Sequence, residues 1–137
     1  MTEKEHKQLT FWAAECAGHV LYIFEQNSKD TRPRNAIEAA KAWSRGEIKI
    51  GEARKFAFAA HAAARETNNL NAKAAARSAG HAAATAHVST HAKYAAKYAI
   101  KAAFDKEMEL NWQKSLTPEK LMQYVNFEKS IISDQKT

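Results

Sequence analysis

Residues 80–100, GHAAATAHVSTHAKYAAKYAI, decide the fold class of this chain. The stretch is rich in alanine, the best helix former, and it holds three histidines and no acid. A helix with alanine on several faces has no bulky side chains, so its neighbours can approach to the short end of the usual range of about 8–10 Å between axes. The stretch therefore predicts the tightly packed middle of a helical bundle.

The composition of the whole chain also favours helices. The chain has 137 residues, enough for one domain with a modest core, and about a fifth of them are alanine. Two prolines and four glycines leave little room for the many tight turns of an all-β fold. We expect one all-α domain over residues 1–137, a compact bundle of five or six helices with alanine-rich central helices. Its core spans about residues 5–133, and the tail DQKT is frayed.

Turn and capping residues divide the first half of the chain into three expected helices. The first runs from about Glu5 to Gln26, with apolar residues at helical spacing. Pro33 opens the second helix and Gly46 closes it. The third begins near Gly51. We expect this third helix and the next to be central, under large side chains from the first, second and last helices, which are Trp12, Phe24, Trp43, Tyr124 and Phe127.

The second half of the chain is less clearly divided. Residues 71–104 form either one long helix or two, and we favour a break at Ser89, followed by Thr90, because these residues can cap a new helix. The stretch DKEMELNWQKS, residues 105–115, is ambiguous. Thr117-Pro118-Glu119 predicts the start of a last amphipathic helix, whose apolar face is formed by Leu121, Tyr124, Val125, Ile131 and Ile132.

The composition indicates a cytoplasmic protein. The N-terminus MTEKEHKQLT mixes charges and lacks the apolar core of a secretory signal, and no stretch is long and apolar enough to cross a membrane. The single Cys16 excludes an internal disulfide and suits a reducing compartment. Nothing resembles a Ser-His-Asp arrangement, a phosphate-binding glycine loop or a carboxylate pair. We therefore expect no enzymatic activity, no cofactor and no membrane partner.

The histidines raise the question of a metal site. On an unbroken helix, His87 and His91 would lie one turn apart, the spacing of a two-histidine clamp, with His81 about 120° away. No acid in residues 71–104 completes the site. The favoured interpretation is histidines that are hydrogen-bonded in the core. A helical-bundle metalloprotein that uses these three residues and His61 is an alternative.

A basic stripe follows these histidines. Lys93, Lys97 and Lys101 repeat every four residues, beside Tyr94 and Tyr98. Lysines interleaved with tyrosines can bind phosphates and stack on bases, so a nucleic-acid-binding protein is another alternative. A solvated helix face is the favoured interpretation, because no nucleic-acid-binding module is apparent.

The segment DTRPRNAIEAAKAWSRGE, residues 30–47, carries an unusual pattern of charge. Arg32 and Arg34 flank Pro33 at a helix start, where positive charge opposes the helix dipole, and Asp30 is near enough to compensate. In the next helix, an arginine, phenylalanine, histidine, arginine stripe is either a partner-binding strip or an internal seam. The candidate partner-binding residues of both helices are Asp30, Arg32, Arg34, Glu38, Arg45, Arg54, His61 and Arg65, with Phe58 between the last two arginines.

Residues of the first helix and Trp112 are the remaining candidates for pairing, packing or association. We expect His19 and Glu15, one turn apart on its polar stripe, to form a solvated pair. Cys16 lies on the apolar stripe and reads as a small core residue. Alanine-lined helices and an exposed Trp112 offer surfaces for a homodimer.

Four stretches in this order resemble the immunity-five-like family, small bacterial immunity proteins of polymorphic toxin systems: ECAGHVLYIFE, DTRPRNAIEAAKAWSRGE, GEARKFAFAAHAAAR and AARSAGHAAATAHVSTHAKYAAKYA. The resemblance covers roughly Cys16 to Ile100. It implies an all-helical protein that neutralises a cognate toxin by binding it. Relatives often carry an exonuclease-subunit label, which we do not transfer, because alanine-rich helices invite false matches to coiled-coil proteins.

The net charge bears on the kind of toxin that the resemblance implies. Inhibitors of nucleases tend to be acidic, because they meet a basic phosphate-binding cleft. This chain has a formal net charge of +6. Either the target is not a nuclease, or binding uses a local acidic patch.

Overall fold

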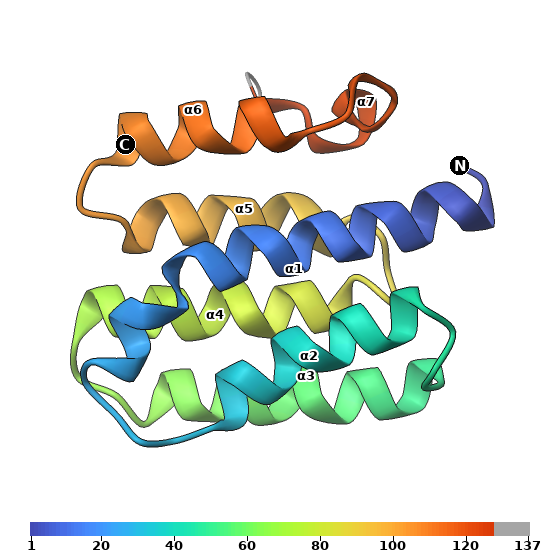
Figure 1. Cartoon of the computed structure of the whole chain (residues 1–137). Coiled ribbons are helices and arrows are strands. Elements are labelled where there is room, and N and C mark those ends of the chain that lie inside the picture. The colour runs from blue at the N-terminus through green and yellow to red at the C-terminus, as the bar shows by residue number, and fades with distance from the viewer. Residues whose placement is uncertain (128–137) are drawn as a thin grey trace.

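The computed structural model describes residues 1–127, which form seven α-helices and one 3-10 turn and contain no strand (Figure 1). The all-α class is confirmed, with more helices than the five or six expected. The helices are α1 (Glu3–Glu25), α2 (Arg32–Ser44), α3 (Ile50–Arg65), α4 (Leu70–Ala84), α5 (His91–Ala102), α6 (Lys106–Leu116) and α7 (Met122–Val125), and the 3-10 turn is η1 (Glu119–Leu121).

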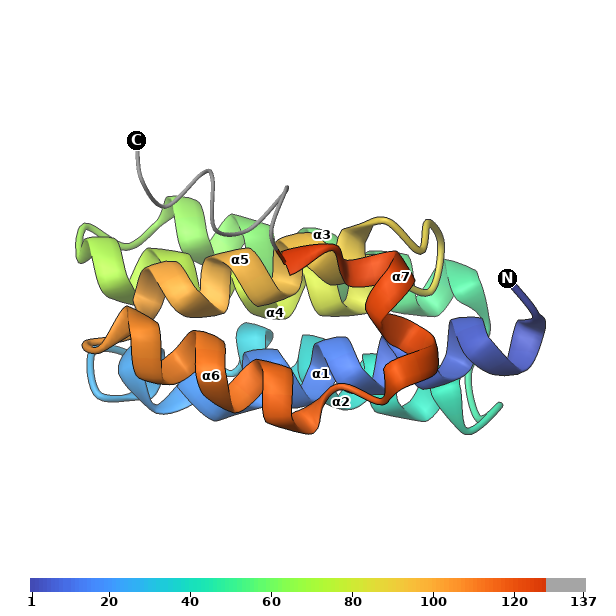
Figure 2. The same cartoon turned by 90° about the horizontal axis from the view of Figure 1, so that it is seen from above.

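The helices pack in two layers. Helices α3, α4 and α5 form one layer with α4 in the middle, and α1 and α2 cover one face of it (Figure 2). Helix α6 packs against α5. We call the opposite face of the three-helix layer, turned away from α1 and α2, the outer face. It is where the side chains considered below are displayed.

Alanine makes the contact between the layers close. Ala79 and Ala82 of α4 are completely buried in one core cluster with Ala13 and Ala17 of α1. Helix α4 is central, as expected. Helix α3 was expected to be central too, but it lies at the edge of its layer, because it buries only an alanine stripe and leaves Phe58 62 % exposed. The aromatic cover is as predicted: Trp12, Phe24, Trp43 and Phe127 are buried, and Tyr124 is partly buried.

The helix ends follow local capping chemistry. Thr2 and Glu5 form a capping box at the start of α1. Asp30 Oδ1 accepts from the Arg32 amide at the start of α2, and Gly46, with a φ of +77°, follows its end. These bounds agree with the predicted first and second helices to within a few residues.

The break in the alanine-rich region is confirmed, and it includes the expected Ser89 and Thr90. Helix α4 ends at Ala84 and α5 begins at His91, so residues 85–90 form a loop. Thr85 holds this loop, because its hydroxyl donates to the His81 carbonyl and its own carbonyl accepts from His6 Nε2 of α1. Thr90 occupies the N-cap position of α5, as expected, although its side chain makes no capping hydrogen bond.

The C-terminal region differs from the predicted long helix. Asp105 caps α6, which occupies the stretch that was ambiguous in the sequence. Thr117 then accepts from the Trp12 indole and donates to the Gln113 carbonyl, and only the short η1 and α7 follow, up to Asn126 with a φ of +54°. Ile131, Ile132 and the tail DQKT lie outside the described residues. No helix within residues 1–127 has the length and apolarity needed to cross a membrane.

Candidate functional site

Three histidines meet on the outer face, one from each helix of the layer. The ring centroids of His61 (α3) and His81 (α4) are 4.9 Å apart, and His81 Nδ1 lies 2.9 Å from His91 Nδ1 (α5). The His81 ring also stacks on Tyr98 with centroids 5.3 Å apart. We call His61, His81, His91 and Tyr98 the histidine cluster. The pairing joins His81 to His91 across the loop, rather than His87 to His91 along one helix.

Arg77 of α4 fixes the tautomer of His61. The guanidinium Nη1 lies 3.0 Å from His61 Nδ1. Because a guanidinium can only donate, Nδ1 accepts, and a neutral His61 carries its proton on Nε2. Partial burial, with the positive charge of Arg77, lowers the pKa of His61 to about 4 and that of His81 to about 3. Burial also lowers the pKa of His91, so the three rings are neutral at pH 7.

Gly80 makes room for the cluster. A Cβ atom at this position would lie 2.6 Å from His61 Nε2, closer than real Cβ contacts. Sequence reasoning missed this residue, although a glycine within an alanine-rich helix is a signal in itself, because it costs about 1 kcal/mol relative to alanine.

The geometry gives the metalloprotein alternative no support. Within the part of the chain that the structure describes, no group of three or more His, Cys, Asp or Glu residues is arranged to hold a metal ion. The Nδ1 lone pair of His61 accepts from Arg77, whose positive charge would also repel a cation.

Two pockets flank the histidine cluster. The first, which we call the cationic pocket, lies between α4 and α5, has a volume of about 390 Å³, and is lined by Leu70, Asn71, Lys73, Ala74, Arg77, Tyr98 and Lys101. The second, the histidine pocket, has a volume of about 170 Å³ and is lined by Arg54, Ala57, Phe58, His61, Ala84, His87 and His91. The outer face therefore has two hollows beside the histidine cluster.

The predicted basic stripe lies on the same face. The Nζ atoms of Lys93 and Lys97 lie 5.5 and 5.8 Å from the ring centroid of Tyr94, and Lys101 Nζ lies 5.5 Å from that of Tyr98. These are cation–π contacts. Because Tyr98 is stacked on His81 and contacted by Lys101, its ring is less available for stacking on bases, whereas Tyr94 is 38 % exposed.

The stripe of α3 exposes both arginines and Phe58 and half-buries His61. Arg54 and Arg65 are exposed, and the Arg54 guanidinium lies 5.7 Å from the ring centroid of the exposed Phe58. Neither arginine forms an ion pair with Glu38. Glu38 instead lines a groove of about 290 Å³ between α2 and α3, beside Glu52.

The arginines of residues 30–47 form ion pairs within the molecule. Arg32 contacts Asp30 at 2.6 Å and Glu66 at 2.9 Å, and its guanidinium lowers the pKa of Asp30. This pairing answers the unfavourable charge at the start of α2, as expected. The other two arginines of this segment are paired as well: Arg34 contacts Glu25 at 2.6 Å and Arg45 contacts Glu47 at 2.9 Å.

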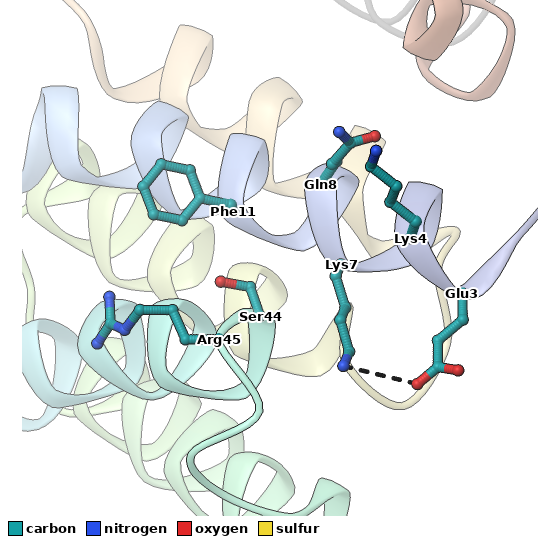
Figure 3. A pocket seen from close by; sticks show the side chains of 7 residues that line it. All are labelled: Glu3, Lys4, Lys7, Gln8, Phe11, Ser44 and Arg45. Carbon is teal, nitrogen blue, oxygen red and sulfur yellow. Dashed lines mark ion pairs between the residues drawn. The ribbon is translucent and has the colours of Figure 1, made fainter.

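A wider groove lies between the start of α1 and the end of α2. Its volume is about 610 Å³, and Figure 3 shows its lining, which comprises Glu3, Lys4, Lys7, Gln8, Phe11, Ser44 and Arg45. Lys7 pairs with Glu3 at 3.6 Å, drawn as a dashed line in Figure 3. Its charges are mixed and largely paired, in contrast to those of the cationic pocket.

His19 does not form the solvated pair with Glu15 that its spacing predicts. Its Nδ1 lies 2.8 and 3.0 Å from the two carboxylate oxygens of Glu109 on α6, and its ring stacks on Trp112 with centroids 3.6 Å apart. Trp112 is thus partly covered by His19, and a homodimer through it stays a prediction.

Cys16 is buried in the core, as predicted, and burial raises the pKa of its thiol.

Comparison with known proteins places this fold in a family. The family model described as Imm-5 like putative immunity protein matches residues 1–126. The chain therefore belongs to this family, and the match extends beyond the stretch from Cys16 to Ile100 that carries the resemblance in the sequence. No curated protein and no solved structure gives a significant match.

Proposed function

We propose that the chain is a non-enzymatic immunity protein that neutralises a cognate toxin by forming a direct complex with it in the cytoplasm of the producing cell. We further propose that the outer face contacts the toxin. The observation that carries this proposal is that the outer face combines exposed aromatic side chains with cations that have no acidic partner within residues 1–127. Membership of the family supports a toxin as the partner.

The cations of the outer face differ in their pairing from the arginines of the α2 segment. The arginines of the α2 segment each contact an acid, as described above. The outer-face cations without an ion pair to any acid in the described part of the chain are Arg54, Arg65, Lys73, Arg77, Lys93 and Lys101. Gathering like charges on one face disfavours the compact state through self-repulsion. This arrangement is better explained by a partner than by folding.

The side chains of this face also suit a protein interface. Protein interfaces are enriched in aromatic residues and arginine, and a few such residues carry most of the binding energy. Phe58 is 62 % exposed beside Arg54, and Tyr94 is 38 % exposed beside Lys93. Helices position these groups, so little ordering is needed on binding.

Co-expression tests this proposal. The product of the gene beside that of this chain, where it is a toxin, is expressed in a bacterial host with and without the chain, and growth and the complex on size exclusion are measured. We expect growth to be restored and a one-to-one complex to form. Continued toxicity in the presence of folded, well-expressed chain would contradict the proposal.

A further inference from the structure

The cationic pocket has the features of an anion receptor. Lys73 and Arg77 from α4 and Lys101 from α5 line a hollow of about 390 Å³, with the amide of Asn71 and the ring of Tyr98. No acid lines it. None of the three cations forms an ion pair within residues 1–127. The attraction between this pocket and an anion is therefore not offset by an internal carboxylate.

Two of these groups are held in position from behind. The guanidinium of Arg77 donates to His61 Nδ1, which orients the fork and leaves its other N–H groups to donate elsewhere. Tyr98 stacks on His81, and Lys101 lies over the Tyr98 ring. Because Arg77 and Tyr98 are already ordered, binding an anion costs less conformational entropy than it would at free surface side chains.

The pocket also has an apolar rim. Leu70, at the start of α4, is 77 % exposed, and Ala74 lies one turn further along the same helix. A matching ligand therefore carries carboxylates next to an apolar side chain. An acidic protein segment has this composition.

We propose that the cationic pocket is the docking site for an acidic segment of the toxin. Carboxylate oxygens of the segment accept from Arg77 and from the ammonium groups of Lys73 and Lys101, while an apolar side chain covers Leu70. This inference rests on the proposed function and specifies its partner. A nucleic acid fits less well, because Tyr98, the aromatic ring that lines the pocket, is already stacked on His81 and contacted by Lys101. The toxin surface that is covered is acidic, unlike the phosphate-binding cleft of a nuclease.

A titration of the purified full chain tests the docking site without the toxin. The probe is the acetylated peptide Glu-Leu-Glu-Glu-Leu-Glu, followed by amide chemical shifts in NMR spectra, with Gln-Leu-Gln-Gln-Leu-Gln as the uncharged comparison. We expect saturable shifts at Ala74, Arg77 and Tyr98 that weaken with added salt, and no such shifts with the glutamine peptide.

Matched variants separate this site from general attraction to a basic protein. Arg77→Gln, or Lys73→Gln with Lys101→Gln if the first variant does not fold, should weaken binding about tenfold or more, the factor that corresponds to 1.4 kcal/mol. Arg65→Gln removes a charge from the same face outside the pocket, so it should change binding far less. Equal weakening by Arg65→Gln, shifts that map elsewhere, or tighter binding of the pocket to a thymidine oligonucleotide of equal charge would overturn the proposal.

The growth assay distinguishes this inference from the proposed function. If the wild-type chain restores growth and the Lys73→Gln, Lys101→Gln variant does so equally well, the docking site is wrong and the immunity role stands. If the wild-type chain fails to restore growth, the immunity role itself is contradicted, whatever the peptide titration shows.

Discussion

At the scale of single residues, the arrangement of the outer face depends on the hydrogen bond between Arg77 and His61. The His61 ring has room for it because Gly80 has no side chain. Gly80 leaves space for the His61 ring, the ring accepts from Arg77, and Arg77 is thereby directed along the cationic pocket. Arg77 and Gly80 lie 16 and 19 positions after His61, on the next helix of the chain. No helical period predicts a contact over such a spacing. Local patterns reveal faces of one helix and not which faces meet.

The substitution Gly80→Ala should destabilise the fold. Alanine favours the helix by roughly 0.5–1 kcal/mol, but its Cβ would lie 2.6 Å from His61 Nε2, and overpacking costs about 1–3 kcal/mol. We expect a net loss in the free energy of unfolding, measured by chemical denaturation. Gly18→Ala in α1 is the matched control, because nothing lies within 4 Å of its Cβ, and it should stabilise by about 0.5–1 kcal/mol. Equal stabilisation by both substitutions would show that the ring has space to move.

The neutral histidines should make stability depend on pH. The pKa values of His61 and His81, about 4 and about 3, lie below the ordinary value of 6.5, so the unfolded chain takes up protons first as the pH falls. The contribution is present in full above about pH 6.5 and is lost as the pH falls to about 4 for His61 and about 3 for His81, with an upper limit of about 1.4 kcal/mol per pH unit for each group, reduced by solvent screening.

Thermal unfolding between pH 7.5 and 5 measures this effect. The lowered carboxylate pKa values, such as that of Asp30, act at lower pH, whereas burial raises the pKa of Glu15, so the histidine contribution is read from the difference between the wild-type chain and a histidine variant. We expect the Tm to fall with pH in the wild-type chain and less steeply in His81→Phe, which keeps an aromatic ring and removes the titration. A wild-type Tm that stays constant through the window would contradict the assignment of neutral buried rings.

At the scale of elements, close packing of alanine places α4 at the centre and sets what the layer can tolerate. Ala79→Leu on the buried face of α4 should lower the free energy of unfolding by about 1–3 kcal/mol or more. The reason is that α1, which packs on this face, cannot move away without losing its own contacts. Ala62→Leu on partly exposed α3 is the control, and we expect a change within about 0.5 kcal/mol. An equal change in the free energy of unfolding for both variants, measured from denaturation curves, would argue against tight packing between the layers.

The elements also show what local sequence can and cannot predict. The bounds of α1 and α2 follow from Thr2, Pro33 and Gly46, which act within a few residues of themselves. Helix α6 was ambiguous, because part of what holds it is distant in sequence: Glu109 meets His19 and Gln113 Nε2 donates to the Ala96 carbonyl. Such contacts leave no trace in the periodicity of either segment.

At the scale of the whole molecule, the charged residues behind the net charge of +6 are unevenly distributed along the chain. Asp30, Glu66 and Glu25 pair with Arg32 and Arg34 at the start of α2, while residues 71–104 contain five cations and no acid. Composition alone gave the sign of the charge, and periodicity gave the Lys93, Lys97 and Lys101 stripe. Only the fold shows that the stripe, the α3 strip and the histidine cluster share one face.

The most direct test of the central claim is the affinity of the chain for its toxin, measured by calorimetry on two matched double variants. One carries Arg54→Gln and Phe58→Ala on the outer face, and the other carries Lys7→Gln and Phe11→Ala in the groove of Figure 3, which also removes one cation and one phenyl ring. The account predicts that the outer-face variant binds about 100-fold more weakly than the wild type, as expected for hot-spot residues, while the groove variant binds as the wild type does. An unchanged affinity for the outer-face variant, or a loss confined to the groove variant, would contradict it.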